Sequence, residues 1–132
     1  MFGLFKRKKA GAADSERAVK LFREGKFEAA LELADSIINA NPDVALSHRF
    51  RGEVLFSMGQ HEASIEAFEC AEQIGGPGIE EVFFWRALAH ANAGRLDEAV
   101  SVLRAYKDTE GASPELVQKC EDAIARMEAD RP

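Results

Sequence analysis

The stretch GKFEAAL, residues 25–31, recurs as GQHEASI at 59–65 and as GRLDEAV at 94–100. The three leading glycines are 34 and then 35 residues apart (59 − 25 and 94 − 59). The agreement extends outward, because Leu21, Phe22, Gly25, Glu28, Ala29 and Glu32 meet identical residues 34 positions later. A fixed period of this length predicts stacked copies of one supersecondary unit.

Each glycine separates two segments with helical apolar spacing. In the third copy the segment before the glycine has Phe83, Phe84, Ala87, Leu88 and Ala91, and in the first copy the segment after it has Ala30, Leu31, Ala34, Ile37 and Ile38. Glycine ends a helix readily because it adopts the left-handed conformation at little cost. The second helix then has an acid in its first turn, where the helix dipole favours a negative charge. Each unit is therefore predicted to be a helix-turn-helix pair.

Breaks between units occur where Pro42 and the run Gly75-Gly76-Pro77-Gly78 interrupt the helical pattern. Ser113-Pro114-Glu115 predicts the start of a last amphipathic helix, with Ser113 as its N-cap. The prediction is an all-α, right-handed solenoid of seven helices over residues 14–129, preceded by a tail at 1–13. The repeats cover about 14–43, 44–78 and 79–110, and a capping helix covers 114–129.

The composition is that of a soluble protein of one domain, with 132 residues, 46% hydrophobic and 30% charged. No window approaches the apolar length of a membrane span, and the apolar residues at the N-terminus precede the basic ones, which is the reverse of a secretory signal. Cys70 and Cys120 are two isolated thiols, typical of a reducing compartment. We expect a cytoplasmic protein, with a peripheral position at the inner membrane face as an option.

Charge is divided unevenly along the chain. The net charge is −6, and the first 13 residues carry +4 with no acid, so that the remaining residues carry −10. An acidic body argues against nucleic acid as a partner. In the tail a short apolar segment is followed by a basic cluster, which predicts weak, reversible contact with an anionic membrane surface. The alternative is a disordered, solubilising tail. The residues predicted to contact the membrane are Phe2, Leu4, Phe5, Lys6, Arg7, Lys8 and Lys9.

No motif for catalysis occurs in the sequence. His48 and His61 belong to the second unit and His90 to the third, and all three are interpreted as packing or surface residues. The glycine-rich run at 75–78 lacks the Lys-Ser/Thr pair of a phosphate loop. We therefore expect no enzymatic activity, no cofactor and no metal.

The sequence resembles the tetratricopeptide repeat family over about residues 14–129. Gly52 matches the small residue of the family's first helix, and Ala18 and Ala87 stand at the same position. At the pattern's alanine position, the three copies have Ala30, Ser64 and Ala99. At the aromatic position that follows, Phe68 matches the pattern, whereas Ala34 and Leu103 depart from it. Pro42 matches the closing proline, and Phe83 matches the first aromatic residue, where the second copy has His48.

The resemblance implies that the first helix of each unit lines a concave groove that binds a peptide or a partner helix. The groove residues it points to are Val19, Phe22, Arg23, Arg49, Glu53, Phe56, Phe84, Leu88 and Asn92. Three exposed phenylalanines here would form an apolar patch beside arginines, suited to a ligand of mixed apolar and acidic character. The alternative is that these rings pack between helices.

A clamp for the C-terminal carboxylate of heat-shock chaperones would place Lys, Asn, Asn, Lys and Arg at five groove positions in this family. This chain has Ser15, Val19, Phe50, Glu81 and Trp85 there, and none fits. The expected function is a scaffold that binds another protein. The alternatives are a secretion-type chaperone, a non-catalytic subunit of a larger assembly, and a homodimer whose groove holds a second copy.

Overall fold

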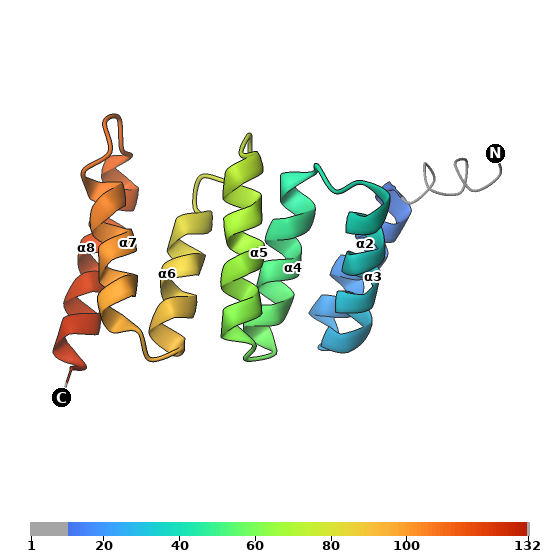
Figure 1. Ribbon diagram of the computed structural model, residues 1–132, viewed down its shortest axis with the longest axis horizontal. Helices are drawn as coiled ribbons and strands as arrows, with labels where there is room; N and C mark the ends of the chain where they lie inside the picture. The colour runs from blue at the N-terminus through green and yellow to red at the C-terminus, as the bar shows by residue number, and fades with distance from the viewer. Residues whose placement is uncertain (1–10, 132) are drawn as a thin grey trace.

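The fold is an array of α-helices arranged one after another along a single axis (Figure 1). The computed structural model describes residues 11–131, and within that range there are seven helices and no strand. Their bounds are α2 Ala12–Arg23, α3 Phe27–Ala40, α4 Ala45–Ser57, α5 His61–Ile74, α6 Val82–Asn92, α7 Leu96–Lys107 and α8 Pro114–Ala129. The predicted all-α class and the number of helices are confirmed.

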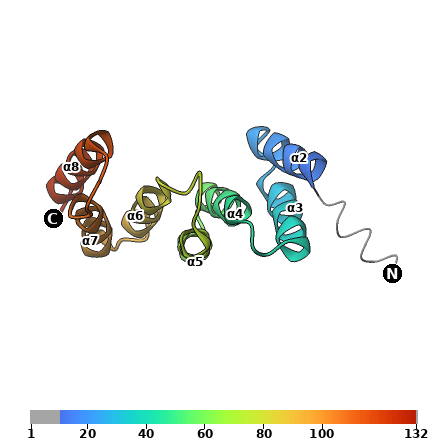
Figure 2. The same ribbon diagram turned by 90° about the horizontal axis from the view of Figure 1, so that it is seen from above.

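The helices pair as antiparallel hairpins, α2 with α3, α4 with α5 and α6 with α7, and α8 closes the array against α7. Contacts run chiefly between consecutive helices. Seen from above, α2, α4, α6 and α8 form the inner side of a curved row and α3, α5 and α7 the outer side (Figure 2). This is the predicted helical-hairpin solenoid.

The three repeated glycines end the first helix of each hairpin in the same way. Gly25, Gly59 and Gly94 have φ of 77°, 77° and 83°. In the first turn the N–H of Gly25 donates to the carbonyl of Phe22 at 3.0 Å, and that of Lys26 to the carbonyl of Leu21 at 2.9 Å. The same pair of bonds recurs in the second and third turns. This is the Schellman motif, which satisfies the last carbonyls of a helix and requires a left-handed residue.

Within the second hairpin, Gly52 brings the two helices into close contact. A Cβ atom at Gly52 would lie 2.5 Å from Cε1 of Phe68, a ring with no exposed surface. The hydroxyl of Ser64, also fully buried, donates to the carbonyl of Gly52 at 3.0 Å. The glycine therefore leaves room for the aromatic ring of Phe68. The buried hydroxyl of Ser64 has its hydrogen-bond partner at the same helix contact.

The last helix begins at the residue that the sequence predicts, but its N-cap forms no side-chain hydrogen bond. Ser113 occupies the N-cap position, with Pro114 at the first turn, but its side chain makes no capping hydrogen bond. Instead, the backbone N–H of Ser113 donates to the hydroxyl of Tyr106 at 3.0 Å. The Tyr106 ring also stacks on Phe83, with 4.2 Å between centroids. This side chain on α7 therefore ties the last turn to the core of the third repeat.

Substitution of Gly52 by Ala should lower the free energy of unfolding by about 1–3 kcal/mol, because the added methyl group overpacks the contact with Phe68. Urea unfolding followed by circular dichroism measures the loss. Combining Gly52→Ala with Phe68→Leu should restore part of the stability, since the smaller side chain leaves room for the methyl group. Losses that simply add in the double variant would contradict the clash.

Candidate functional site

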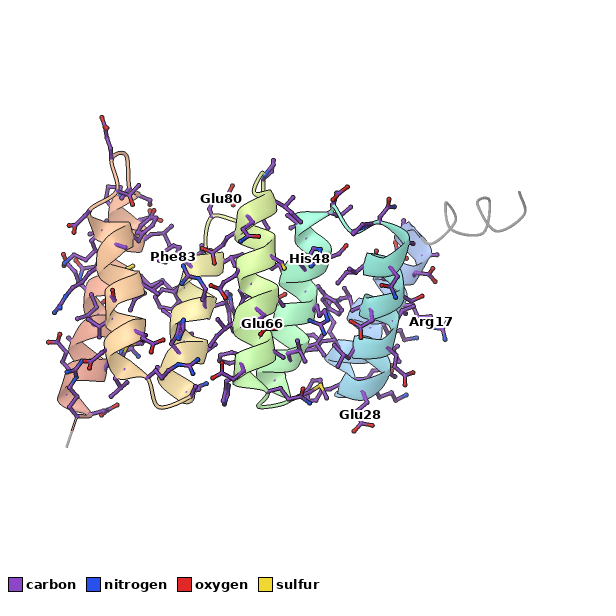
Figure 3. The ribbon with its side chains drawn as sticks, viewed as in Figure 1. Arg17, Glu28, His48, Glu66, Glu80 and Phe83 are labelled. Atoms are coloured by element: carbon purple, nitrogen blue, oxygen red, sulfur yellow. The ribbon has the colours of Figure 1, made fainter. Side chains whose placement is uncertain are left out.

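The concave side carries a cavity of about 450 Å³ at the middle of the array. It lies between α4, α6 and α8, on the inner side of the curve in Figure 2. Glu80 stands in the segment that leads into α6 (Figure 3). Two aromatic rings and a leucine form an apolar wall, and charged side chains form the rim. The lining residues are Arg49, Gly78, Glu80, Glu81, Phe84, Trp85, Leu88 and Lys119.

Arg49 is held on the α4 side of the cavity. One of its guanidinium nitrogens, Nη1, donates to the carbonyl of Gly78 at 2.8 Å. The other, Nη2, lies 3.8 Å from the Glu53 carboxylate one helical turn away. Burial raises the pKa of Glu53, and the charge of Arg49 opposes that shift. The guanidinium thus joins α4 to the junction before α6.

Lys119 closes the other side of the cavity from α8. Its ammonium lies 4.5 Å from the centroid of the Phe84 ring and 3.3 Å from the Glu81 carboxylate. A cation over an aromatic face is attracted by the ring quadrupole. The lysine side chain is half exposed, so it can contact a molecule in the cavity without losing all of its own contacts.

Trp85, in the apolar wall of the cavity, connects the second and third repeats. Its indole packs edge-on against Phe56, with 5.4 Å between ring centroids. The tryptophan is half-buried and lines the cavity, whereas Phe56 lies against both Trp85 and His61. An amphipathic ring placed in this way offers a flat apolar surface and one hydrogen-bond donor.

The structure brings part of the predicted groove set together. Arg49, Phe84 and Leu88 line the cavity, and Glu53 lies beside Arg49. Val19 and Arg23 line a separate hollow of about 530 Å³ along α2. Asn92 is exposed at the last position of α6.

The three predicted phenylalanines do not form an exposed patch. Phe84 is only 9% exposed and belongs to the core around α7 and α8. Phe22 is half-buried between Phe27 and Phe50, at centroid distances of 5.6 and 5.7 Å. Phe56 is half-buried against its own ring partners. These rings pack between helices, as the alternative prediction has it: Phe22 and Phe56 have aromatic neighbours on other helices, and Phe84 belongs to a core with residues of α7 and α8.

Five of the cavity residues are not in the predicted groove set, and two of them, Trp85 and Lys119, lie on helices; the other three are Gly78, Glu80 and Glu81. In the sequence Trp85 stands out only as a misfit to the carboxylate clamp, although a lone tryptophan in a first helix is itself a signal of a binding surface. Lys119 lies on α8, which is predicted only as a cap. The structure shows that α8 continues the row of first helices (Figure 2).

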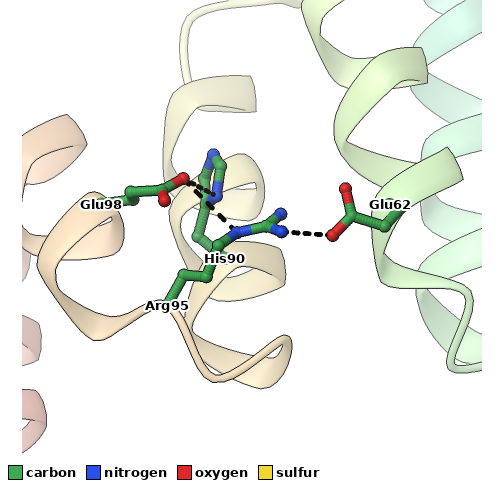
Figure 4. Close-up of polar contacts among 4 residues, drawn as sticks. All are labelled: Glu62, His90, Arg95 and Glu98. Carbon is green, nitrogen blue, oxygen red and sulfur yellow. Dashed lines mark hydrogen bonds and ion pairs between the residues drawn. The ribbon is translucent and has the colours of Figure 1, made fainter.

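A polar cluster connects the second and third repeats away from this cavity (Figure 4). Arg95, in the turn between α6 and α7, makes an ion pair with Glu62 at the start of α5 and lies 3.4 Å from Glu98. Nδ1 of His90 lies 3.3 Å from the same Glu98 carboxylate, and the histidine side chain is 12% exposed. Burial, together with the charge of Arg95, lowers the pKa of His90, while Glu98 opposes the shift.

The described residues hold no group of three or more His, Cys, Asp and Glu side chains placed to bind a metal ion. Cys70 is exposed and Cys120 is buried in the core of the third repeat. Burial raises the pKa of the Cys120 thiol, which disfavours the reactive thiolate.

The predicted membrane-contact residues, Phe2 to Lys9, lie outside the described part of the chain. Among the helices of residues 11–131, none is both long and apolar enough to cross a membrane.

The family model described as "Tetratricopeptide repeat" matches residues 15–79 and 76–115. Among curated proteins, a tetratricopeptide repeat and J domain-containing co-chaperone of Cryptococcus neoformans is 30% identical over 98 residues. The match covers 74% of this chain but only 19% of the co-chaperone.

Solved structures show the same fold at low sequence identity. The second such domain of human RPAP3, in complex with an HSP70 peptide, superposes with a TM-score of 0.74 at 20% identity, covering 92% of this chain and 98% of that one. The Yersinia enterocolitica type III secretion chaperone SycD, in complex with a peptide of the translocator YopD, gives 0.73 at 17% identity and covers 94% and 99%.

The lowered pKa of His90 should make the protein less stable as the pH falls from 7 to about 5.5. In the unfolded chain His90 is protonated near its ordinary pKa of 6.5, whereas in the folded protein it is protonated only at lower pH. The unfolded state therefore binds more protons, and the free energy of unfolding falls as the pH falls. One proton contributes at most about 1.4 kcal/mol per pH unit. Urea unfolding of the wild type and of His90→Gln measures the effect. The variant should lose less stability over this interval, and equal slopes would contradict the assignment.

Proposed function

Because the chain belongs to the tetratricopeptide repeat family, we propose that it binds a segment of a partner protein against its concave face and has no catalytic activity of its own. The observation that supports this most directly is the cavity between α4, α6 and α8, with Trp85 and Leu88 on its wall and two cations at its rim. Cavities of a few hundred Å³ with an apolar wall and a few convergent polar groups are suited to specific binding.

The chemistry of the cavity favours an apolar side chain as the anchor of the bound segment. Arg49 and Lys119 already have partners in Gly78, Glu53 and Glu81, so their charges are partly compensated. An acidic group on the ligand would therefore be attracted chiefly at the exposed end of Lys119, where it would compete with the Glu81 carboxylate for the ammonium group. We propose a ligand that inserts an aromatic or aliphatic side chain beside Trp85 and places an acidic residue toward α8.

An internal segment fits this cavity better than a C-terminal carboxylate. Two of the five clamp positions line the cavity: Glu81 stands where the clamp has its second Lys and Trp85 where it has Arg, so the two cations that hold a terminal carboxylate there are missing. RPAP3 is bound to an HSP70 peptide in its structure, and SycD to a peptide of a translocator. The two superpose on this chain almost equally well, so the likeness in fold supports a peptide-binding module and is equally compatible with a secretion-type chaperone. A non-catalytic subunit and a homodimer with a mutually filled groove remain alternatives.

Substitution in the cavity should weaken peptide binding. Peptides selected against the wild type from a random display library can be titrated with Trp85 as the reporter, since it is the only tryptophan of the chain. Arg49→Glu and Leu88→Ala should each raise the dissociation constant at least about ten-fold, because both side chains line the cavity.

The matched control is Glu66→Lys, at an exposed position of α5 on the outer side of the array (Figure 3). It changes charge by the same amount as Arg49→Glu in the opposite sense and should leave the affinity within about two-fold. Circular dichroism melts verify that the variants are folded. Equal affinities for wild type, Arg49→Glu and Leu88→Ala would rule out this cavity as the binding site.

Weak membrane contact through Phe2, Leu4, Phe5 and Lys6–Lys9 stays a prediction from the sequence. If it occurs, the protein should co-sediment with vesicles rich in phosphatidylserine but not with neutral ones, and removal of residues 1–10 should abolish the bound fraction. Raising the salt concentration should weaken it, because the attraction is electrostatic. Identical sedimentation with and without these residues would exclude the membrane contact.

A further inference from the structure

One position of the repeat is filled differently in each copy. In the second repeat it holds Phe68, whose fully buried ring packs between its own hairpin and the next one. The third repeat has Leu103 there, also fully buried. The first repeat has Ala34, 34 residues before Phe68. The first repeat therefore lacks the large side chain that fills the other two.

The helices around Ala34 do not close over the missing volume. An apolar cavity of about 330 Å³ lies between α2, α3 and α4. Its lining residues are Ser15, Ala18, Val19, Ala34, Ile37, Val44, Leu46, Ser47 and Phe50. A closed apolar cavity of about 150 Å³ is large enough to take up benzene, so a phenyl ring fits this one.

The rim of the cavity is unusually apolar for a surface. Val44 is 43% exposed and Leu46 is 51% exposed, two of the three large exposed hydrophobic residues of the described chain. Ala18 and Ala34 at the bottom are almost fully buried. The cavity thus opens to solvent through side chains that gain from being covered.

The chain carries a suitable occupant close by. Ser15, in the first turn of α2, lines the cavity, and the segment before α2 contains Phe2, Leu4 and Phe5. The six residues from Lys6 to Gly11 span up to about 20 Å when extended, which is ample to bring Phe5 back over this first turn.

Charge also favours this position for the tail. Lys6, Arg7, Lys8 and Lys9 follow the apolar residues. Asp14 and Glu16 lie in the first turns of α2, and Asp43 directly precedes the rim residue Val44. A tail seated in the cavity would hold its four positive charges near these carboxylates at the end of an acidic domain.

We propose that the segment Phe2–Phe5 inserts an aromatic side chain into the cavity between α2, α3 and α4, at the place that Phe68 occupies in the second repeat. The N-terminal segment is then a detachable part of the first repeat's core. This proposal is independent of peptide binding at the cavity between α4, α6 and α8.

A double-mutant cycle in the full chain tests the contact. Phe2→Ser with Phe5→Ser keeps the length and charge of the tail, and Ala34→Phe fills the cavity from inside. In the wild-type background the serine pair should lower the melting temperature by about 3 °C or more, and in the Ala34→Phe background by less than about 1 °C. If Ala34→Phe does not unfold cooperatively, Ala34→Leu replaces it, since the third repeat accommodates Leu103 at this position. A Glu66→Ala background, on the outer face, should retain the full loss.

Three results would overturn the proposal. Equal losses in the wild-type and Ala34→Phe backgrounds would mean that the tail acts elsewhere. An unchanged melting temperature on Phe2→Ser with Phe5→Ser would mean that the cavity does not hold the tail, and if the same change abolished binding to phosphatidylserine vesicles, the tail would be a membrane contact instead. A loss that appears only at high protein concentration would place the tail in the cavity of a second copy.

Discussion

Close approach of the two helices within each hairpin is the constraint on which the rest of the structure depends. It is made possible by small residues that face each other at the same place in each copy: Ala18 and Ala30, Gly52 and Ser64, and Ala87 and Ala99, all of them buried. In the second hairpin the backbone of Gly52 accepts a hydrogen bond from Ser64 and leaves space for Phe68. Because every hairpin has this shape, successive hairpins stack with the same apolar faces and the array curves as a whole.

The concave cavity follows from that stacking. First helices lie side by side on the inner face, so residues from consecutive repeats converge although they are far apart in the sequence. Arg49 of α4 reaches the carbonyl of Gly78 before α6, and Lys119 of α8 covers the ring of Phe84 on α6. The segment before α6 contributes Gly78, Glu80 and Glu81, and the other lining residues lie on helices. A binding surface built on helices in this way is held by the core beneath it.

The fold could be predicted from the sequence because its determinants are local and repeated. Gly25, Gly59 and Gly94 mark three turns that need a left-handed residue, and the structure gives them identical hydrogen bonds. The groove was predicted less completely. Helical spacing places Phe22, Phe56 and Phe84 on one side of their helices, but it does not specify how far neighbouring rings cover them. Trp85 and Lys119 were missed because their roles depend on contacts between different repeats. Ala34 departs from the repeat pattern, but whether the helices close over this smaller side chain depends on packing that the sequence pattern does not contain.

A linear array divides its stability among its junctions, and these junctions are unequal. The second and third hairpins share a filled core and the ion pair between Arg95 and Glu62. The junction between the first and second hairpins contains the apolar cavity beside Ala34. Local opening in such an array starts at the junction with the least buried apolar contact and need not spread to the rest. We therefore expect the α2–α3 hairpin to separate from α4 more readily than the second hairpin separates from the third, and Val19 and Arg23 would move with it. Such an opening would leave the cavity between α4, α6 and α8 intact and would shorten the concave face that α2 extends.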